Sequence, residues 1–205
     1  MIGVLRMPIG NLQSVCNAVH QIGHDPIIVD ENSPTDDVTH LIVPGVGHFR
    51  AVMRHLDEHG LSGRIRNFAA SGRPLLGICA GMQLLASVGT EGGETPGLDL
   101  VPGKVIKLAD GEGLRLPHVG WNRVTVRHAH PVFEDLKPNR DFYFVHSYAM
   151  QPDNKENLLA ESEYGRPFAC VVGRDNIVGF QFHPEKSQLN GLRLLENFCC
   201  WNGQC

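Results

Sequence analysis

Short apolar runs alternate with helical patterns in the first half of the chain. The runs cover residues 2–5, 26–29, 41–43 and 74–78. Each is almost wholly apolar, as is typical of strands in a parallel sheet that is covered on both faces. Helices are predicted between them, at 11–22 and from about 48 to 59, each followed by a glycine. This alternation predicts an α/β fold with a doubly wound, mainly parallel sheet and helices on both faces.

A third helix is predicted directly after the run at 74–78. Apolar side chains between Met82 and Val88 share one face at helical spacing, and Gly89 closes the pattern. Residues 90–103 are rich in Gly, Glu and Pro and lack periodicity, so we expect a surface loop there.

The second half of the chain has a different pattern. Short strand-like runs follow one another with few helical patterns between them, at 105–108, 116–119, 124–126, 142–145, 158–160, 168–172 and 177–182. We therefore expect the C-terminal half to extend the sheet with antiparallel hairpins, one of them turning at 174–176. A final helix is predicted over 191–201. The whole chain, 1–205, is expected to form one domain.

Composition leaves this fold prediction unchanged and excludes several classes of function. The 205 residues are 42% hydrophobic and carry a formal net charge of −4, so there is no basic field for nucleic acid. The first residues lack a signal-peptide pattern, and no apolar run approaches the roughly 18 residues of a membrane span. We therefore expect a cytoplasmic protein that does not bind membranes. The six cysteines show no C-x-x-C spacing, which argues against a disulfide framework and a zinc ribbon.

The most informative stretch is GICAG at residues 77–81, which places a thiol between two glycines at the end of an apolar run. Cys79 is predicted to occupy a sharp strand-to-helix turn, where the helix N-terminus favours a thiolate. Gly77 and Gly81 would let the strand and the helix approach closely, as in the G-x-S-x-G nucleophile elbow. A lone cysteine is more often buried and inert, but this glycine frame favours a nucleophile.

Two further segments are expected at the same carboxyl edge of the sheet. The turn Pro44–Gly47 can point amide N–H groups at an anion, which makes it a candidate half of an oxyanion hole together with the N–H of Ala80. Near the end of the chain, strand alternation places Gln181, His183 and Glu185 on one face. A histidine oriented by a carboxylate can act as the base for a thiol. Taken alone, the first segment could equally be an ordinary strand-to-helix loop, and the second a structural histidine with a surface glutamate.

Three further patterns carry less information. His55–His59 matches the metalloprotease pattern H-x-x-E-H, but such short matches arise by chance and the predicted helix meets Gly60 at once. His128 and His130 could ligate a metal, although a solvated polar turn before Pro131 is the simpler expectation. No Walker loop and no strand-embedded G-x-G-x-x-G occurs in the sequence, so nucleotide binding is not indicated.

Five segments, taken in order, resemble those of a known family. They are PGVG at 44–47, GICAGMQ at 77–83, PHVGWN at 117–122, YFVHSY at 143–148 and QFHPEKS at 181–187. Together they resemble the triad-type (class I) glutamine amidotransferases, and within them the glutaminase subunits of imidazole glycerol phosphate synthases. The likeness extends from the first strand to the final helix, which makes coincidence improbable.

This resemblance implies a Cys-His-Glu triad. Cys79 would attack the side-chain amide of glutamine, His183 would pass the thiol proton to the departing ammonia, and Glu185 would orient His183. A glutamyl thioester would then be hydrolysed to glutamate. The positions that match the family's substrate and oxyanion sites lie in the turn at 44–47, in the helix after Cys79 and at the end of the strand-like run at 142–145. They are Gly45, Val46, Gly47, Ala80, Gln83, His146, Ser147 and Tyr148.

The resemblance also implies a partner protein and no cofactor. In that family a (β/α)₈-barrel synthase subunit forms a heterodimer with the glutaminase, receives the ammonia and makes imidazole glycerol phosphate in histidine biosynthesis. The glutaminase step needs neither a metal nor an organic cofactor. Positions near the shared interface match Asn11, Trp121, Asn122 and Lys186. The glutaminase alone is expected to be nearly silent, because the 44–47 loop must reorient an amide before the oxyanion hole is complete.

One departure from the family pattern concerns this partner. The family's first strand runs into DYGMGNL, whereas residues 6–12 here read RMPIGNL. Arg6 replaces an acid and Pro8 replaces a flexible glycine. The departure keeps open a related glutaminase that supplies ammonia to a nucleotide-sugar or surface-polysaccharide pathway. A non-catalytic regulatory subunit, against which the complete triad argues, and a free-standing cysteine hydrolase also stay open.

Overall fold

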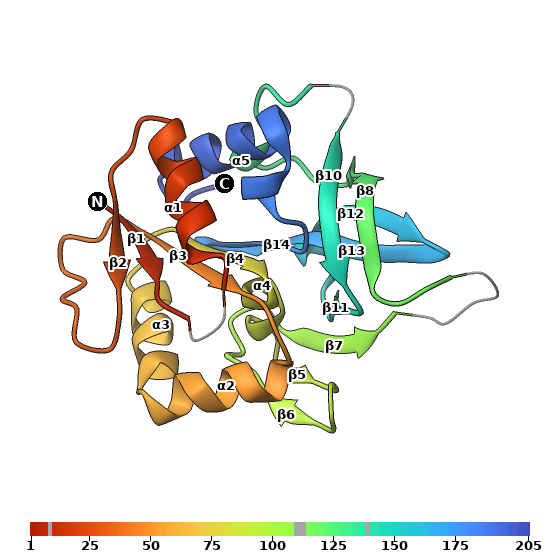
Figure 1. The fold of residues 1–205 in the computed structure, drawn as a ribbon, viewed down its shortest axis with the longest axis horizontal. Helices are drawn as coiled ribbons and strands as arrows, with labels where there is room; N and C mark the ends of the chain where they lie inside the picture. The colour runs from red at the N-terminus through yellow and green to blue at the C-terminus, as the bar shows by residue number, and fades with distance from the viewer. Residues whose placement is uncertain (8–9, 109–113, 138–139) are drawn as a thin grey trace.

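The computed structural model describes residues 1–7, 10–108, 114–137 and 140–205 and is organised around one large mixed sheet (Figure 1). The parallel strands are β1 (Ile2–Leu5), β2 (Pro26–Val29), β3 (His40–Gly45), β4 (Leu75–Cys79) and β14 (Ile177–Phe180). The antiparallel strands are β13 (Arg166–Arg174), β12 (Leu158–Tyr164) and β9 (Thr125–Val126). Their order, β2-β1-β3-β4-β14-β13-β12-β9, confirms the predicted fold class.

Helices cover both faces of the parallel strands (Figure 1). The helices α1 (Leu12–Gln21) and α5 (Gln188–Cys200) lie on one side, and α2 (Phe49–Glu58), α3 (Leu61–Ala70) and α4 (Ala80–Leu84) lie on the other. Successive residues of β3 enter different cores: Ile42 packs in the core with α1 and α5, whereas Leu41 and Val43 pack in the core with α2 and α3. Both faces of β1, β3, β4 and β14 are therefore buried, which explains their continuous apolar runs, whereas the edge strand β2 is only partly covered. No helix in the described ranges is long and apolar enough to cross a membrane.

Several strands of the second half do not extend the large sheet, so that part of the sequence-based expectation is wrong. Strand β10 (Asp141–His146) pairs with β8 (His118–Arg123) in a separate antiparallel pair. A second small sheet has the order β11 (Tyr148–Pro152), β7 (Gly103–Lys107), β5 (Val88–Gly89) and β6 (Thr95–Pro96). Buried and half-buried residues alternate along β10, and Phe142 and Phe144 pack in the core with α5. One face of β10 thus covers the core, which places the strand across the large sheet rather than beside it.

The sequence pattern assigned no element between residues 60 and 73, where the structure has α3. Leu61, Ile65 and Phe68 are buried on one face of this helix. Gly60, in a left-handed conformation with φ 66°, separates α3 from α2. The two helices are therefore joined by a single turn. Gly60, which was predicted to follow the end of the second helix, is also the residue before α3.

Two predictions around the third helix are also corrected. The helix expected to continue to Val88 ends at Leu84, because Val88 belongs to β5 and pairs with β6 and β7. Residues 90–103 are not simply a surface loop, since Leu98 and Val101 are buried in the core with α2 and α3. The turn expected at 174–176 is confirmed: it joins β13 to β14 with Asp175 at φ 52°.

His130 and His59, from the two histidine patterns of the sequence, make hydrogen bonds within their own segments. His130 is buried rather than solvated, and its Nδ1 accepts a hydrogen bond of 3.2 Å from the N–H of Val132 in the 3₁₀ turn Pro131–Phe133. Burial lowers the pKa of His130 to about 4. His59 at the end of α2 bonds through Nδ1 to the carbonyl of His55. In the described part of the chain, no group of three or more His, Cys, Asp or Glu residues could hold a metal ion.

Candidate active site

Cys79 occupies the predicted turn between a strand and a helix. It is the last residue of β4 and directly precedes α4, and its side chain is buried. Its φ of 55° and ψ of −111° lie outside the regions that L-residues prefer. Such a backbone costs roughly 1–3 kcal/mol and persists only where the surrounding packing enforces it. Here β4 and α4 are buried along their whole length, which supplies that packing.

Three glycines let the backbones around Cys79 come together. A Cβ atom on Gly77 would lie 2.6 Å from the carbonyl oxygen of Gly81, and one on Gly45 would lie 2.7 Å from the nitrogen of Gly81. A Cβ on Gly81 would overlap the carbonyl oxygen of Val43. The structure therefore supports the predicted reason for the two glycines of the elbow. It also gives Gly45 a packing role between β3 and α4.

Strand register brings the three predicted segments to one edge of the sheet. The last residue of β3, Gly45, pairs with Cys79, and the last residue of β14, Phe180, pairs with Ile78. The chain segments that follow β3, β4 and β14 therefore leave the sheet side by side, at its carboxyl edge. The turn expected at 44–47 is shorter than predicted, because Pro44 and Gly45 still belong to β3.

His183 and Glu185 meet, although not by the strand alternation that was expected. The strand ends at Phe180, and Glu185 lies in a 3₁₀ turn, Pro184–Lys186. This turn folds the carboxylate back onto the histidine, with 2.7 Å between His183 Nδ1 and Glu185 Oε1. Both side chains are buried, with exposed fractions of 1% and 0%. The Asn11 side-chain amide, at the start of α1, donates a second hydrogen bond of 2.8 Å to the same Oε1.

The other ring nitrogen of His183 is available to the cysteine. Nε2 is buried and has no hydrogen-bond partner among the described residues. Burial of the ring opposes its protonation, but the nearby Cys79 sulfur and the Glu185 carboxylate outweigh burial and raise the pKa of His183. The raised pKa favours an imidazolium beside the sulfur, which is the partner that a thiolate needs.

A cavity of about 310 Å³ lies in front of Cys79. Its wall comes from the ends of β4 and β10, from the segments that follow β3, β4, β5 and β10, and from the residue before β8: Val46, Gly47, Cys79, Ala80, Gln83, Glu91, Pro117, Val145, His146, Ser147 and Tyr148. All the predicted substrate positions except Gly45 belong to this wall. Gln83 is buried, and its side-chain Nε2 donates to the carbonyl of Tyr148 at 2.9 Å.

Glu91 is a cavity residue that the sequence did not suggest. It lies in the stretch expected to be a surface loop, and its Oε2 accepts a hydrogen bond of 2.8 Å from the N–H of Phe49 at the start of α2. Its position depends on the fold of β5, which turns residue 91 back toward the elbow. Because Glu91 and Phe49 are 42 residues apart in the sequence, no local pattern indicates their contact.

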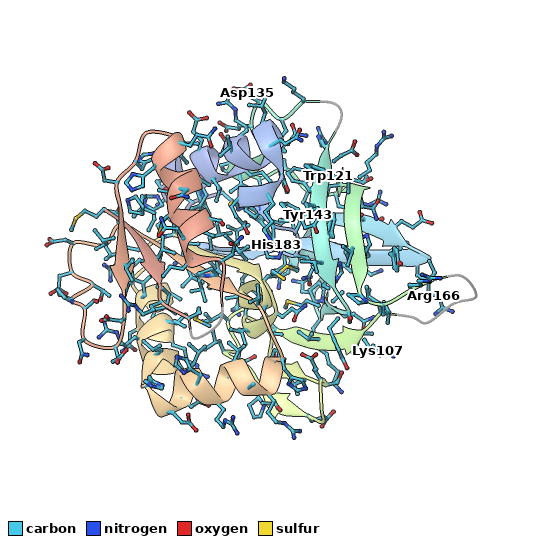
Figure 2. All side chains as sticks on the ribbon, viewed as in Figure 1. Lys107, Trp121, Asp135, Tyr143, Arg166 and His183 are labelled. Carbon is cyan, nitrogen blue, oxygen red and sulfur yellow. The ribbon has the colours of Figure 1, made fainter. Side chains whose placement is uncertain are left out.

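The predicted interface residues lie on and beside an outward-facing surface. Figure 2 shows Trp121, Tyr143 and His183 following one another from β8 across β10 to the end of β14. The Trp121 ring contacts Tyr143 edge-on with 6.1 Å between centroids, and the Lys186 Nζ lies 5.9 Å from the Tyr143 ring centre. Asn122 is half-buried and donates to the carbonyl of Glu163 at 2.7 Å.

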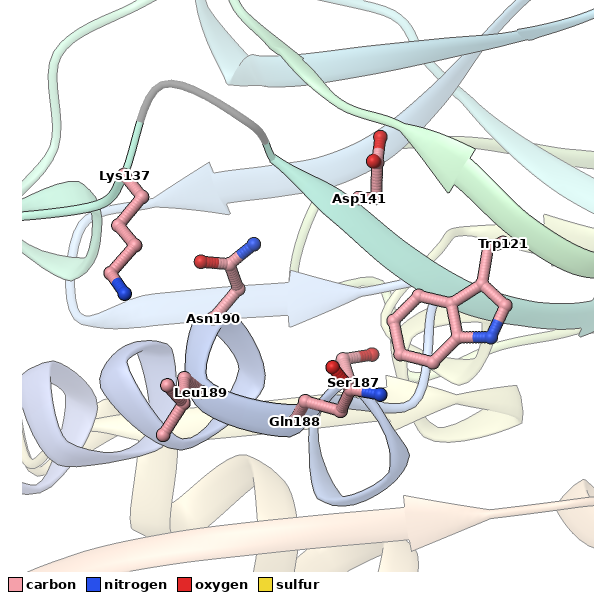
Figure 3. Close-up of a pocket in the computed structure, with 7 residues that line it drawn as sticks. All are labelled: Trp121, Lys137, Asp141, Ser187, Gln188, Leu189 and Asn190. Carbon is pink, nitrogen blue, oxygen red and sulfur yellow. The ribbon is translucent and has the colours of Figure 1, made fainter.

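A pocket of about 520 Å³ opens beside Trp121 (Figure 3). The indole lies on one side of it, and residues from Ser187 to Asn190 at the start of α5 lie on another, with Lys137 and Asp141 completing the wall. In the departure segment, Arg6 is exposed and Met7 is buried. Pro8 and Ile9 lie outside the described residues, so the predicted effect of that segment stays a prediction.

Comparisons with known proteins agree with this geometry. The family model "Glutamine amidotransferase class-I" matches residues 8–200. The chain is 44% identical over 202 residues to the imidazole glycerol phosphate synthase subunit HisH of Wolinella succinogenes, covering 97% of this chain and 98% of the relative. It is 46% identical over 189 residues to HisH of Symbiobacterium thermophilum, covering 92% and 88%.

Solved structures show the same fold at low sequence identity. PurLQS from Thermotoga maritima superposes with a TM-score of 0.75 at 16% identity, covering 97% of both chains. A crystal structure of a glutamine amidotransferase gives a TM-score of 0.74 at 23% identity, covering 96% of both. With the family model matching nearly the whole sequence, this chain belongs to the class-I glutamine amidotransferase family.

Proposed function

We propose that this chain is the glutaminase subunit of an imidazole glycerol phosphate synthase. It hydrolyses L-glutamine to glutamate and ammonia and passes the ammonia to a (β/α)₈-barrel synthase subunit in histidine biosynthesis, in the cytoplasm, with residues 1–205 acting as one glutaminase domain. The observation that carries the activity is His183, which Glu185 holds through Nδ1, and whose buried Nε2 has no hydrogen-bond partner among the described residues. The sulfur of Cys79, a residue of the cavity wall, lies near this histidine. The names of the relatives support the choice of subunit.

The reaction follows from this arrangement. The Cys79 thiolate attacks the side-chain amide carbon of glutamine, and backbone N–H groups at Gly47 and Ala80, both on the cavity wall, hold the resulting oxyanion. The His183 imidazolium gives its Nε2 proton to the amide nitrogen, so that the carbon–nitrogen bond breaks and ammonia leaves. A water molecule then attacks the thioester carbon, and His183 takes a proton from the water. The carbon–sulfur bond breaks, the product acid loses its proton to solvent and leaves as glutamate, and the Cys79 thiolate and the His183 imidazolium are restored.

The cavity wall suits the polar groups of free glutamine. Both hydrogens of the Gln83 amide are engaged, by the carbonyl of Tyr148 and by Oε1 of Gln181 at 3.1 Å, which leaves the Gln83 oxygen as an acceptor for the substrate. Glu91 provides a negative charge for the α-ammonium group. Backbone groups at Ser147 and Tyr148 are the partners for the α-carboxylate.

The test is a glutaminase assay with and without the barrel subunit and its nucleotide ligand. Glutamate release should be slow for the chain alone and rise in the complex. Strong turnover without a partner would instead support a free-standing hydrolase. A glutamine-mimicking electrophile should label Cys79, and glutamine should protect it; labelling that glutamine does not reduce would favour a non-catalytic subunit. If the complex transfers the ammonia to a nucleotide sugar and not to the imidazole precursor, the chain belongs to the surface-polysaccharide pathway.

Replacing Asn11 with alanine should lower kcat for glutamine hydrolysis about tenfold. The Glu185 carboxylate would lose one of its two hydrogen bonds, and a hydrogen bond to a charged group contributes roughly 1.5–3 kcal/mol. Asn17→Ala is the matched control, because Asn17 lies on the exposed side of α1 and bonds to Gln13. Rates are compared in the complex at saturating glutamine; a kcat within twofold of the wild-type value would show that Asn11 does not hold the triad.

The barrel subunit is proposed to cover the surface around Trp121. Among the described residues, the exposed large hydrophobic side chains include Val119 and Trp121 on β8 and Leu189 on α5, at 56%, 49% and 66% exposure. Trp121 and Leu189 line the same pocket. Exposed aromatic and aliphatic side chains beside a pocket are typical of a protein interface.

Trp121→Ala should therefore weaken the complex about 30-fold, since a buried interface tryptophan typically contributes 2 kcal/mol or more. Ile28→Ala is the control: Ile28 is 43% exposed on β2, an edge strand of the large sheet, whereas Trp121 lies in the separate β8–β10 pair. Affinity is measured by titration calorimetry, and labelling of Cys79 in the free chain should not change. Equal affinity for both variants would place the partner on another surface.

A further inference from the structure

We propose that Gln181 is a further residue of the glutaminase site, which donates a side-chain N–H to the Cys79 sulfur and stabilises the thiolate. This inference rests on the proposed function and deepens it. Gln181 directly follows β14 and is completely buried. Its side chain does not line the glutamine cavity, but its Nε2 lies 3.9 Å from Cys79 Sγ.

Burial makes the orientation of this amide important. An amide presents a donor at one end and an acceptor at the other, and the two ends have nearly the same shape. With its nitrogen toward the sulfur, Gln181 attracts a thiolate; with its oxygen there, it would repel one. The residues that surround Gln181 decide between the two.

A carbonyl group fixes the choice. The Tyr148 oxygen can only accept hydrogen bonds, and it receives one from Gln83 Nε2 at 2.9 Å and one from His146 Nδ1 at 2.8 Å. The Gln83 nitrogen is thereby turned toward both Tyr148 and Gln181, so Gln181 must offer its oxygen to Gln83, at 3.1 Å. The nitrogen of Gln181 is left facing Cys79.

Two buried histidines, His146 and His118, fix the second hydrogen bond to the Tyr148 carbonyl. Because His146 donates from Nδ1, its Nε2 is an acceptor, and His118 Nδ1 lies 3.1 Å from it. His118 Nε2 in turn faces the Asn122 amide nitrogen at 3.4 Å. Burial lowers the pKa of His146 to about 3, assisted by the charges of His118 and His183, so His146 stays neutral and keeps one donor and one acceptor.

The sulfur has a second neighbour that makes the donor necessary. The Val145 carbonyl oxygen also lies 3.9 Å from Cys79 Sγ. A thiol can donate its proton to this oxygen, whereas a thiolate is repelled by it. The Gln181 N–H offsets that repulsion, because it binds the thiolate more strongly than the thiol. Removing this donor should reduce the reactive thiolate population at neutral pH about tenfold.

The experiment measures the alkylation rate of Cys79 by iodoacetamide in the full chain, which requires neither glutamine nor a partner. Exposed Cys200 and Cys205 are first replaced by serine, so that peptide mapping follows Cys79. Gln181→Met keeps the side-chain length but removes the N–H donor. Gln181→Asn keeps the amide but, being one methylene shorter, moves it away from the Cys79 sulfur. Gln151→Met is the matched control, because Gln151 is exposed on β11.

Both Gln181 variants should react about tenfold more slowly than the wild type at pH 7 and approach its rate at pH 10, whereas the Gln151 variant should match it throughout. The other titratable groups near Cys79 are present in every variant: His183 and Glu185 beside it, and Glu91, His146 and Tyr148 on the cavity wall. Unchanged alkylation, whatever happens to glutamate release, would overturn the inference and limit Gln181 to packing. Slower alkylation in a chain that never hydrolyses glutamine would uphold the inference while the proposed function failed. Thermal unfolding identifies a misfolded Met variant, in which case the Asn variant decides.

Discussion

Replacing Cys79 with alanine should abolish glutamate release, lowering kcat in the complex by about 10⁴-fold or more. Alanine has no atom that can form the thioester, and in hydrolases of this type the loss of the nucleophile removes most of the rate enhancement. His183 and Glu185 would remain bonded to each other, because their contact does not depend on the sulfur. Residual turnover would be limited to what substrate binding and the oxyanion donors provide.

The Cys79 result requires a cysteine control and a binding measurement. Cys200→Ala changes an exposed cysteine at the end of α5 and should leave kcat unchanged. Calorimetry should show that the Cys79 variant still binds glutamine. The loss of glutamate release then results from the missing nucleophile and not from misfolding. Glutamate release within tenfold of the wild-type rate would contradict the assignment of Cys79 as the nucleophile.

Gly81→Ala should destabilise the fold by about 3 kcal/mol or more, a large effect for one methyl group. The new Cβ would overlap the Val43 carbonyl oxygen; this oxygen belongs to the backbone of β3, and the Cβ is bonded directly to the backbone of α4, within a buried strand–helix contact. Neither can move aside as a flexible side chain can, so the elbow must separate from β3. For a chain of this length, the melting temperature should fall by roughly 6–12 °C.

The matched control for this prediction is Gly63→Ala. Gly63 lies in α3, is exposed, and would have nothing within 4 Å of an added Cβ. Alanine is a better helix former than glycine, so this variant should gain roughly 0.5–1 kcal/mol. Denaturant unfolding of both variants gives the comparison. A Gly81 variant as stable as the wild type would show that the elbow can relax without loss.

The elbow could be predicted because its cause is local. An apolar run, two glycines and a following helical pattern are all visible within a dozen residues, and the structure places Cys79 in the expected turn. The parallel strands were also predictable, since burial on both faces leaves a continuous apolar run. Helix α3 has an equally clear apolar face, and it was missed because Gly60 was interpreted as the end of a helical region rather than a turn between two helices.

The remaining site residues depend on contacts between distant segments. Glu91 reaches the cavity because β5 pairs with β6 and β7, and Val88 is part of a sheet that no local pattern indicates. The orientation of Gln181 depends on a carbonyl at residue 148, and carbonyls leave no signature in a sequence. The contact of His183 with Glu185 was predicted for the wrong reason: a 3₁₀ turn, not strand alternation, brings them together.

The pairing of β4 with β14 has a consequence for protein engineering. Neighbouring strands lie about 4.8 Å apart, so the main-chain ladder fixes where the Cys79 and His183 segments leave the sheet. The N–H of His183, three residues beyond the ladder, is held by the carbonyl of Tyr143 on β10 at 2.9 Å. A slip of one residue would exchange the two buried faces of β14 and is strongly disfavoured. Loops that bind substrate or partner can therefore be exchanged at this edge, to change which amide is cleaved or where the ammonia goes, while the reacting pair stays in place.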